Sequence, residues 1–460
     1  MSSIIKNGII VTASDIYKGD IFVEDGIIKE IGINIIKKCD QIIDAEGKYV
    51  IPGGIDVHTH LNLDVGFAVA NDDFYTGTVA AACGGTTSII DHMGFGPTGC
   101  NLHHQVKTYH EYAKNNAVID YSFHGVVQHV DDKIIEEMKE IVDTEGIPSF
   151  KVYLTYGFKV SDGEALKVLI RLKELGGITT VHAENNDAVN YFREMFIKQG
   201  KKAPIYHALS RPDECEAEAI SRMINLASLG DNAPLYIVHL STKLGLDYIK
   251  TAQSKGQKVY AETCPQYLLL DEERYNEPNN QGLKYIMSPP LRKKHNQMEL
   301  WKGLRDGNIQ VVATDHCPFS FNKEKQLGVD DFSKCPSGGP GIETRMPLMF
   351  SEGVMKNRID LNKFVDVTST SPAKIFGMYP KKGTIAVGSD ADIVLIDPKK
   401  EVTLTKSMLH ENVDYTSYEN MKLKGYPVLT MVRGKVIVRD NNFIGDKGYG
   451  QFIKRNSCIK

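Results

Sequence analysis

The pattern of apolar and polar residues is the same near both ends of the chain: short apolar runs separated by turns, which is typical of antiparallel strands. We expect N-terminal strands over residues 4–5, 9–11, 20–23 and 27–31, with a hairpin turn at Glu24-Asp25-Gly26. Near the C-terminus we expect a strand over 391–397 that stops at Pro398, and a hairpin of 428–433 and 435–438 around Gly434. Each end is too small to fold alone, so the two ends are predicted to pair into one β-sandwich.

Between the ends, strand-like segments alternate with helical ones. Stretches 131–142, 163–175 and 215–229 show helical spacing of apolar residues. Eight β-rich segments recur, most of them followed by a helical stretch: 49–57, 86–91, 119–127, 149–154, 178–181, 235–240, 258–262 and 309–314. This alternation predicts an α/β fold, a (β/α)8 TIM-type barrel. The expected domains are 1–50 for the N-terminal part of the sandwich, 51–380 for the barrel, and 381–460 for the C-terminal part and tail.

Composition narrows the possible partners and compartment. The 460 residues carry a net charge of −4 without a basic block, which argues against nucleic acid and a membrane surface as partners. The chain starts without a signal peptide and has no apolar run of roughly 20 residues, so we expect a cytoplasmic protein. The 8 cysteines form no C-x-x-C pair, which argues against a disulfide framework. Cys317 is interpreted as a packed, reduced thiol.

Polar residues gather at the predicted strand ends. In barrels of this kind the active site lies at the carboxyl ends of the strands. The segments concerned are Asp56-Val57-His58-Thr59-His60, Phe150-Lys151-Val152-Tyr153, Thr180-Val181-His182-Ala183-Glu184, Ile237-Val238-His239-Leu240 and Val312-Ala313-Thr314-Asp315-His316. His58 and His60, two positions apart on a strand, point to one face and can reach one ion. Four histidines and an aspartate at four strand ends therefore predict a site for zinc or a related divalent metal.

Lys151 is the most informative single residue. It lies within an apolar strand, where a charged ammonium is costly unless it is paired. One interpretation is a salt bridge to a core carboxylate. In the other, burial and nearby metal lower the lysine pKa, and the neutral amine takes up carbon dioxide to form a carbamate. Together with the histidines and Asp315, we favour the carbamate, which can bridge two metals as a carboxylate does.

At this point the chain resembles the amidohydrolase superfamily and, within it, the hydantoinase/dihydropyrimidinase family. Two further segments are most similar to the bacterial D-phenylhydantoinase branch, residues 91–96 and 206–212. The resemblance runs from the first strands to near the C-terminus. Its motifs are Pro52-Gly53-Gly54-Ile55-Asp56-Val57-His58-Thr59-His60, Gly84-Gly85-Thr86-Thr87, Ser149-Phe150-Lys151, Val181-His182-Ala183-Glu184-Asn185, Glu262-Thr263-Cys264-Pro265-Gln266-Tyr267-Leu268, Met287-Ser288-Pro289-Pro290-Leu291-Arg292 and Ala313-Thr314-Asp315-His316-Cys317.

The resemblance implies a role for each matching position. His58 and His60 would hold one metal together with Asp315, His182 and His239 would hold the other, and carbamylated Lys151 (N6-carboxylysine) would bridge them. Zinc fits such ligands, and manganese or cobalt could replace it. Tyr156 would bind the substrate oxygen, Asp315 would transfer the proton, and Ser288 and Ser337 would contact the ring amide. The family usually has Asn where Ser337 stands, but that contact is thought to use the main chain.

The activity implied is hydrolysis of a cyclic amide by a hydroxide bridging two metals. The substrate would be a 5-substituted hydantoin, opened to an N-carbamoyl amino acid, and the enzyme a cytoplasmic homotetramer. Dihydropyrimidinase and allantoinase remain alternatives. A dihydroorotase would need an Arg where Asn62 stands. Tyr153 and Val160 replace bulky aromatic residues of relatives, which leaves the preferred ring substituent open.

Two further classes remain. A single-metal deaminase would not need Lys151. A non-enzymatic assembly protein related to dihydropyrimidinase would have lost ligands, whereas all six ligand positions are filled here.

Overall fold

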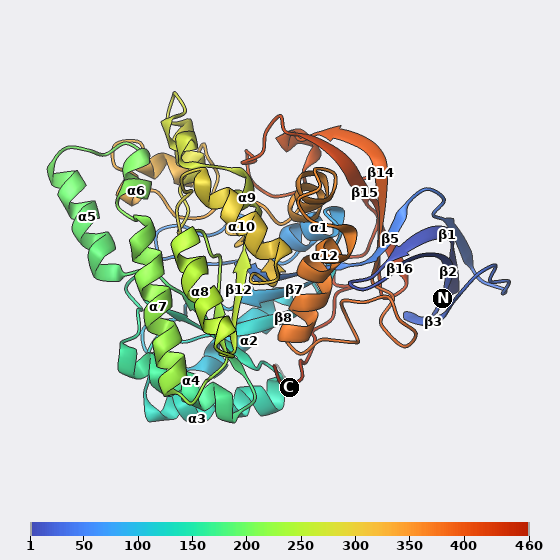
Figure 1. Ribbon diagram of the computed structural model, residues 1–460, viewed down its shortest axis with the longest axis horizontal. Helices are drawn as coiled ribbons and strands as arrows, with labels where there is room; N and C mark the ends of the chain where they lie inside the picture. The colour runs from blue at the N-terminus through green and yellow to red at the C-terminus, as the bar shows by residue number, and fades with distance from the viewer. Residues whose placement is uncertain (1, 459–460) are drawn as a thin grey trace.

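A closed barrel of eight parallel strands forms the centre of the protein, of which this computed structural model describes residues 2–458 (Figure 1). The strands pair in chain order: β6 (Gly54–Thr59), β7 (Thr86–His92), β8 (Asp120–Val126), β9 (Ser149–Tyr153), β10 (Ile178–His182), β11 (Leu235–Ile237), β12 (Val259–Thr263) and β13 (Val311–Val312). A parallel bridge between Thr59 and His316 joins the first strand to the segment that follows the last. The predicted (β/α)8 fold is confirmed.

Helices cover the outside of the barrel, with α4, α7, α8 and α10 on one side of the strands in Figure 1. The three predicted helices are α3 (Asp132–Glu140), which continues as a π-helical turn over Ile141–Glu145, α4 (Asp162–Glu174) and α7 (Asp213–Leu229). The others are α1 (Thr76–Cys83), α2 (Leu102–Ala113), α5 (Asn186–Lys198), α6 (Ile205–Leu209), α8 (Lys243–Ser254), α9 (Pro265–Leu269), α10 (His295–Arg305), α11 (Arg345–Leu348), α12 (Leu361–Val365) and α13 (Ser371–Ile375).

The two chain ends form one nine-stranded, mostly antiparallel sheet, as predicted. Its strands are β1 (Ser2–Val11), β2 (Ile16–Glu24), β3 (Ile27–Gly32), β4 (Gln41–Asp44), β5 (Tyr49–Pro52), β14 (Ile393–Thr403), β15 (Lys422–Val432), β16 (Lys435–Arg439) and β17 (Asn442–Phe443). The sheet curls until Ile27 bridges Asp390, and side chains from both ends share a separate apolar core. The turn expected at Asp25-Gly26 is present, with both residues at positive φ.

Two predicted strand boundaries are wrong. The strand expected to stop at Pro398 continues to Thr403, because a register shift between Asp397 and Glu401 absorbs the proline. The strand expected over 49–57 is divided between the two sheets, with Gly53 at the crossing. A Cβ on Gly53 would lie 2.0 Å from Thr87 Oγ1, so only glycine permits this close approach.

A buried ionic cluster joins the barrel to the terminal sheet. Lys382 Nζ lies 2.6 Å from carboxylate oxygens of both Asp120 on β8 and Asp392, and 2.9 Å from one of Asp390. Arg433, after β15, also pairs with Asp120. These charges compensate one another where the two sheets meet.

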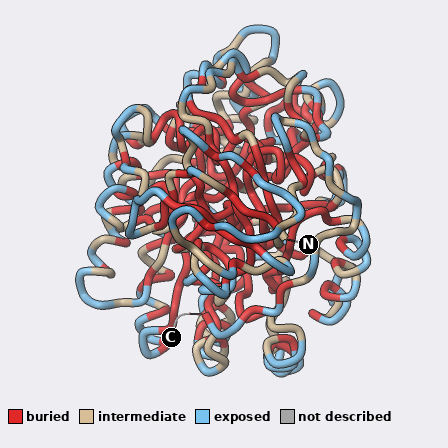
Figure 2. The backbone as a smooth tube through the Cα atoms, turned by 90° about the vertical axis from the view of Figure 1, so that its right-hand side faces the viewer, coloured by how far each residue is buried: buried red, intermediate tan, exposed pale blue. Residues whose placement is uncertain are grey.

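Figure 2 shows buried segments filling the centre of the molecule. In residues 2–458 no helix combines the length and apolar character needed to cross a membrane.

Candidate active site

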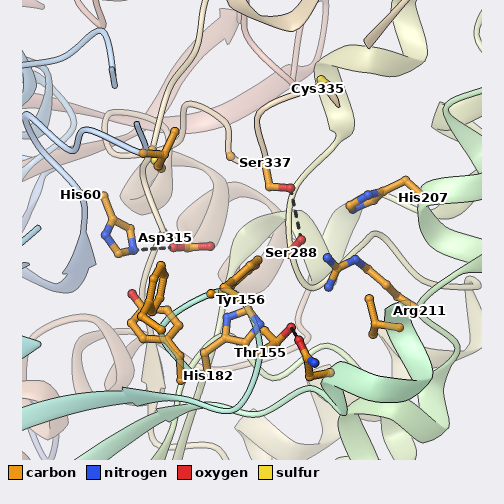
Figure 3. Close-up of a pocket in the computed structure, with 18 of the residues that line it drawn as sticks. His60, Thr155, Tyr156, His182, His207, Arg211, Ser288, Asp315, Cys335 and Ser337 are labelled. Atoms are coloured by element: carbon orange, nitrogen blue, oxygen red, sulfur yellow. Dashed lines mark hydrogen bonds and ion pairs between the residues drawn. The ribbon is translucent and has the colours of Figure 1, made fainter. Parts of the chain in front are cut away.

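All nine site residues predicted from the sequence line one cavity of about 620 Å³ at the barrel mouth (Figure 3). They come from the ends of β6, β9, β10 and β11, from the segment after β13, and from two loops. They are His58, His60, Lys151, Tyr156, His182, His239, Ser288, Asp315 and Ser337. Cys317 also lines the cavity; it is a buried free thiol packed with Leu63 and Phe319, as predicted.

Strand alternation places the first two histidines on the cavity side of β6. Ile55 and Val57 pack with Ile90 in an apolar cluster. Successive side chains of a strand point to opposite faces, so His58 and His60 lie on the face opposite Ile55 and Val57. Both histidines line the cavity.

The first candidate half-site consists of His58, His60 and Asp315. The Nε2 atoms of both histidines lie 3.1 Å from Oδ1 of Asp315, and Figure 3 shows His60 and Asp315 facing each other. Ligands held at about 2.0–2.1 Å around one tetrahedral ion are about 3.3 Å apart. Burial lowers the pKa of His60 to about 4, so this ring is neutral, as a metal ligand must be. Although burial raises it, the pKa of Asp315 is held well below its usual range, first by His58.

The second candidate half-site consists of His182 and His239. Nδ1 of His182 lies 2.9 Å from Nε2 of His239, and the rings meet edge to face. The other nitrogen of His182 binds Glu184 at 2.8 Å, and Arg211 donates to the same carboxylate oxygen at 2.6 Å. Glu184 and Arg211 therefore fix the ring of His182 with one nitrogen directed toward His239.

Lys151 lies between the half-sites without a counterion. It is 1% exposed, and its side chain makes no hydrogen bond or ion pair with any residue in 2–458. Its ammonium lies 5.2 Å from the ring centroid of Tyr153. Burial lowers the pKa of Lys151 to about 8, against smaller opposing contributions from Asp315 and Glu262. The salt bridge considered from the sequence is absent from the described residues, and the amine is readily deprotonated.

Three of the candidate residues have a left-handed backbone. φ is +56° at Asp315, +38° at His239 and +73° at Tyr156. This region is costly for residues other than glycine and asparagine, and such strain concentrates at functional sites. Asn62, by contrast, has a φ of +57° in a loop, where its side-chain oxygen accepts a hydrogen bond from the Phe74 amide. The side chains of Asp315, His239 and Tyr156 all line the cavity, whereas other residues with positive φ, such as Arg433 and Asp440, lie outside it.

Two residues behind the cavity were not singled out from the sequence. Glu262, at the end of β12, binds Nδ1 of His58, accepts from the amide of His239, and takes the hydroxyl of Tyr236. His92, at the end of β7, packs against the rings of both His58 and His60. Each lies at the carboxyl end of a barrel strand, and this position in the sequence could have indicated a residue of the site.

Aromatic side chains form one wall of the cavity. Ring centroids of Phe95 and Phe158 are 3.8 Å apart, and those of Tyr153 and Phe158 5.0 Å. Tyr156 continues this wall toward the two serines, whose hydroxyls lie 3.3 Å apart. Burial raises the pKa of Tyr156 to about 12, so its hydroxyl keeps its proton and can donate. The cavity therefore combines an apolar wall with a cluster of metal-ligating side chains.

Comparison with known proteins agrees with this arrangement. The amidohydrolase family model matches residues 49–437, most of the chain. The chain belongs to the amidohydrolase family. A D-phenylhydantoinase of Escherichia coli O1:K1 / APEC is 54% identical over 100% of this amidohydrolase and 99% of that protein. The resemblance inferred from the sequence is confirmed.

Solved structures show the same architecture over the full length of this amidohydrolase. Dihydropyrimidinase from Brevibacillus agri NCHU1002 superposes with a TM-score of 0.98 at 47% identity, covering 100% of both chains. D-Hydantoinase (dihydropyrimidinase) from Thermus sp. gives 0.96 at 41%, covering 99% of each. L-Hydantoinase (dihydropyrimidinase) from Arthrobacter aurescens gives 0.90 at 31%, covering 98% of this chain and 99% of that one. A protein named D-hydantoinase and one named L-hydantoinase thus share this fold.

Proposed function

We propose that this amidohydrolase opens the ring of 5-substituted hydantoins, of the D-phenylhydantoin kind, to give N-carbamoyl amino acids. The observation that carries the proposal is the unpaired Lys151 enclosed by four histidines and Asp315 beside an aromatic wall. The relative named D-phenylhydantoinase, 54% identical, supports the same substrate class.

The donor set fits two divalent ions. His239 Nδ1 is buried and lacks a hydrogen-bond partner among residues 2–458, and imidazoles with a nearby carboxylate suit zinc, manganese or cobalt. His58, His60 and Asp315 would hold one ion, His182 and His239 the other, and Lys151 as its carbamate would bridge them. Two such ions supply an activated water and polarise the carbonyl under attack.

The protein's own groups would orient the ring and move the proton. Tyr156 donates its hydroxyl to the oxygen that gains charge, since its pKa of about 12 keeps it protonated. Asp315, 13% exposed and ionised, takes the proton from the nucleophilic water and returns it to the leaving ring nitrogen. The loops carrying Ser288 and Ser337, which lie next to Tyr156, would contact the ring amide. This division places acid–base chemistry and ring binding on different elements.

The aromatic wall supports a bulky ring substituent. Phe95, Tyr153 and Phe158 provide edge and face contacts of the kind that aromatic groups favour. Tyr153 and Phe158 thus supply the aromatic surface that was in doubt from the sequence. A phenyl group would gain more from this wall than the unsubstituted edge of dihydrouracil.

A substrate panel tests the proposal. Both enantiomers of 5-phenylhydantoin, dihydrouracil, allantoin and dihydroorotate would be compared by the ring-opened product formed. We expect the D-phenylhydantoin to have the highest kcat/KM. Faster opening of dihydrouracil would favour dihydropyrimidinase, which the Brevibacillus agri neighbour's name also supports. Failure to open any ring would refute the proposal and favour a non-enzymatic assembly protein.

The assembly and compartment are proposed as a homotetramer in the cytoplasm. The resemblance supports the tetramer, and the 8 free cysteines, six of them buried, suit a reducing compartment. Light scattering of the purified protein would test the tetramer, and a mass other than that of four subunits would contradict it. Fractionation of the source cells would test the cytoplasmic location.

A further inference from the structure

The cavity extends beyond the candidate ligands to a second, polar end. Figure 3 shows His60 and Asp315 on one side of the cavity and Arg211 on the other, with Tyr156 and Ser288 between them. Helix α5 borders the cavity with residues spaced three and four positions apart, which places them on one face of the helix. These residues are Asn186, Val189, Asn190 and Arg193. A largely polar helix face therefore lines the cavity away from the reacting groups.

Arg193 is the residue of this face that carries a charge. Its side chain is half-buried, and its guanidinium forms no hydrogen bond or ion pair with any residue in 2–458. Glu194 and Asp331 raise the pKa of Arg193, but burial and the neighbouring Arg211 have larger effects and lower it. Asp331 instead accepts hydrogen bonds from the amide and hydroxyl of Ser333, at 3.0 and 2.7 Å. Because a guanidinium stays charged at physiological pH, Arg193 brings an unpaired positive charge to the cavity.

Arg211, which lines the same cavity, has a carboxylate partner. It is buried and donates to Glu184 at 2.6 Å, and Glu184 also binds His182. The charge of Arg211 is therefore compensated within the protein. Arg193 has no such carboxylate, and the planar fork of a guanidinium matches the two oxygens of one. The partner that fits Arg193 is an acidic group that enters the cavity with a ligand.

We propose that Arg193 binds a carboxylate on the ring substituent of the substrate, so that hydantoins with an acidic side chain are a second substrate class of this enzyme. This inference rests on the proposed ring opening and extends its substrate range. Phe95 and Phe158 would contact an aromatic substituent, whereas a flexible acidic chain would extend toward α5. Arg193 would then determine specificity without contacting the bond that breaks.

The test compares hydantoin-5-propionate with its amide, which has nearly the same size and shape but no charge. kcat/KM for both compounds would be measured with wild type, Arg193→Gln and Arg193→Lys. The acid-to-amide ratio should be about tenfold higher in wild type than in Arg193→Gln, because a hydrogen bond between charged groups is worth at least that factor. Arg193→Lys keeps the charge without the fork and should keep part of the ratio. kcat/KM for phenylhydantoin should stay close to wild type in both variants.

Lys198, at the end of α5, provides the matched control. Its side chain is 79% exposed, lies 3.9 Å from Glu194, and is not among those that line the cavity. Lys198→Gln removes the same charge from the same helix and should keep the wild-type ratio. Since each ratio is taken within one protein sample, partial unfolding of a variant does not change it.

Three outcomes would overturn the proposal. The acid-to-amide ratio could be equal in wild type and Arg193→Gln, or it could fall as far in Lys198→Gln. Wild type could also open phenylhydantoin but neither of the propionate compounds, which would leave the proposed function in place. Wild type that opens no ring at all would instead reject the proposed function, and this inference with it.

Discussion

Two buried lysines in this protein have opposite surroundings. Lys382, at the junction of barrel and terminal sheet, is enclosed by Asp120, Asp390 and Asp392. Burial lowers its pKa, but Asp392 and Asp390 raise it above the usual value. Lys151, at the barrel mouth, is as deeply buried but has no counterion among residues 2–458, and burial lowers its pKa to about 8.

The difference separates a structural charge from a reactive one. A buried ammonium with three carboxylates is stable and inert. A buried amine without a counterion is neutral for much of the time near pH 8, and a neutral amine is nucleophilic. Lys325, another buried lysine without a carboxylate partner, donates to three main-chain carbonyl oxygens, whereas the amine of Lys151 has no such acceptors among residues 2–458. Each prediction below tests one side of this contrast.

The largest effect is expected for Lys151→Ala. Without the amine no carbamate can form, so the two proposed ions would lose their bridging ligand, and the rate of the proposed ring opening should fall by about 10³-fold or more. Elemental analysis and kcat would be measured together. Lys151→Met fills the same space without an amine and should behave alike. Two bound ions and a normal rate in either variant would refute the bridge.

Lys382→Met tests the structural lysine. Removing its ammonium leaves Asp392 without a cation, while Arg433 still pairs with Asp120 and Lys381 with Asp390. We expect the free energy of unfolding to fall by about 3–5 kcal/mol. Urea unfolding would measure it. The folded fraction should keep its normal ion content. If the variant lost metal but kept its stability, Lys382 would not be the structural lysine, and the contrast with Lys151 would fail.

Glu262→Gln tests how far metal affinity at the barrel mouth depends on the negative charge that Glu262 places behind the candidate ligands. The amide keeps the volume and an acceptor for His58, but loses the negative charge that makes this imidazole a better ligand. Metal affinity should fall about 10–100-fold in a chelator titration. Asn62→Asp, on the loop after β6, is a matched control with an added charge and should leave that affinity close to wild type.

The pH dependence of carbon dioxide uptake tests the pKa of Lys151 directly. In metal-free protein the ammonium loses its proton as pH rises through about 8, and only the neutral amine reacts. The initial rate of carbamylation should therefore be about tenfold higher at pH 9 than at pH 7. The rate would be measured by stopping the carbamylation reaction at successive times, with the dissolved carbon dioxide concentration held fixed. A rate independent of pH across this range would contradict a lowered pKa.

The smallest effect is expected for Ser337→Asn, which installs the residue usual in the family. If the contact to the ring amide uses the main chain, KM for phenylhydantoin should change by less than about threefold. The hydroxyl contact of Ser337 with Ser288 is lost in the variant, so Ser337→Ala serves as its control. A large rise in KM for both variants would assign the contact to the serine hydroxyl.

Much of the barrel, and the residues that line its mouth, could be predicted because their signals are local. Strand and helix periodicity, and the i, i+2 spacing of His58 and His60, can be read within a few residues. Glu262 could not be assigned in this way, since its partner His58 lies 204 positions away in sequence. The lack of partners around Lys151 is likewise a property of packing. The continuation of β14 past Pro398 depends on a register shift that composition does not reveal.

The central claim is that the unpaired amine of Lys151 carries carbon dioxide in the active enzyme. Carbon-13 NMR of protein reconstituted with ¹³C-bicarbonate and zinc would test it directly. We predict one carbamate resonance per subunit, lost in Lys151→Ala and retained in Lys382→Met. A fully active, two-ion enzyme without that resonance would contradict the account.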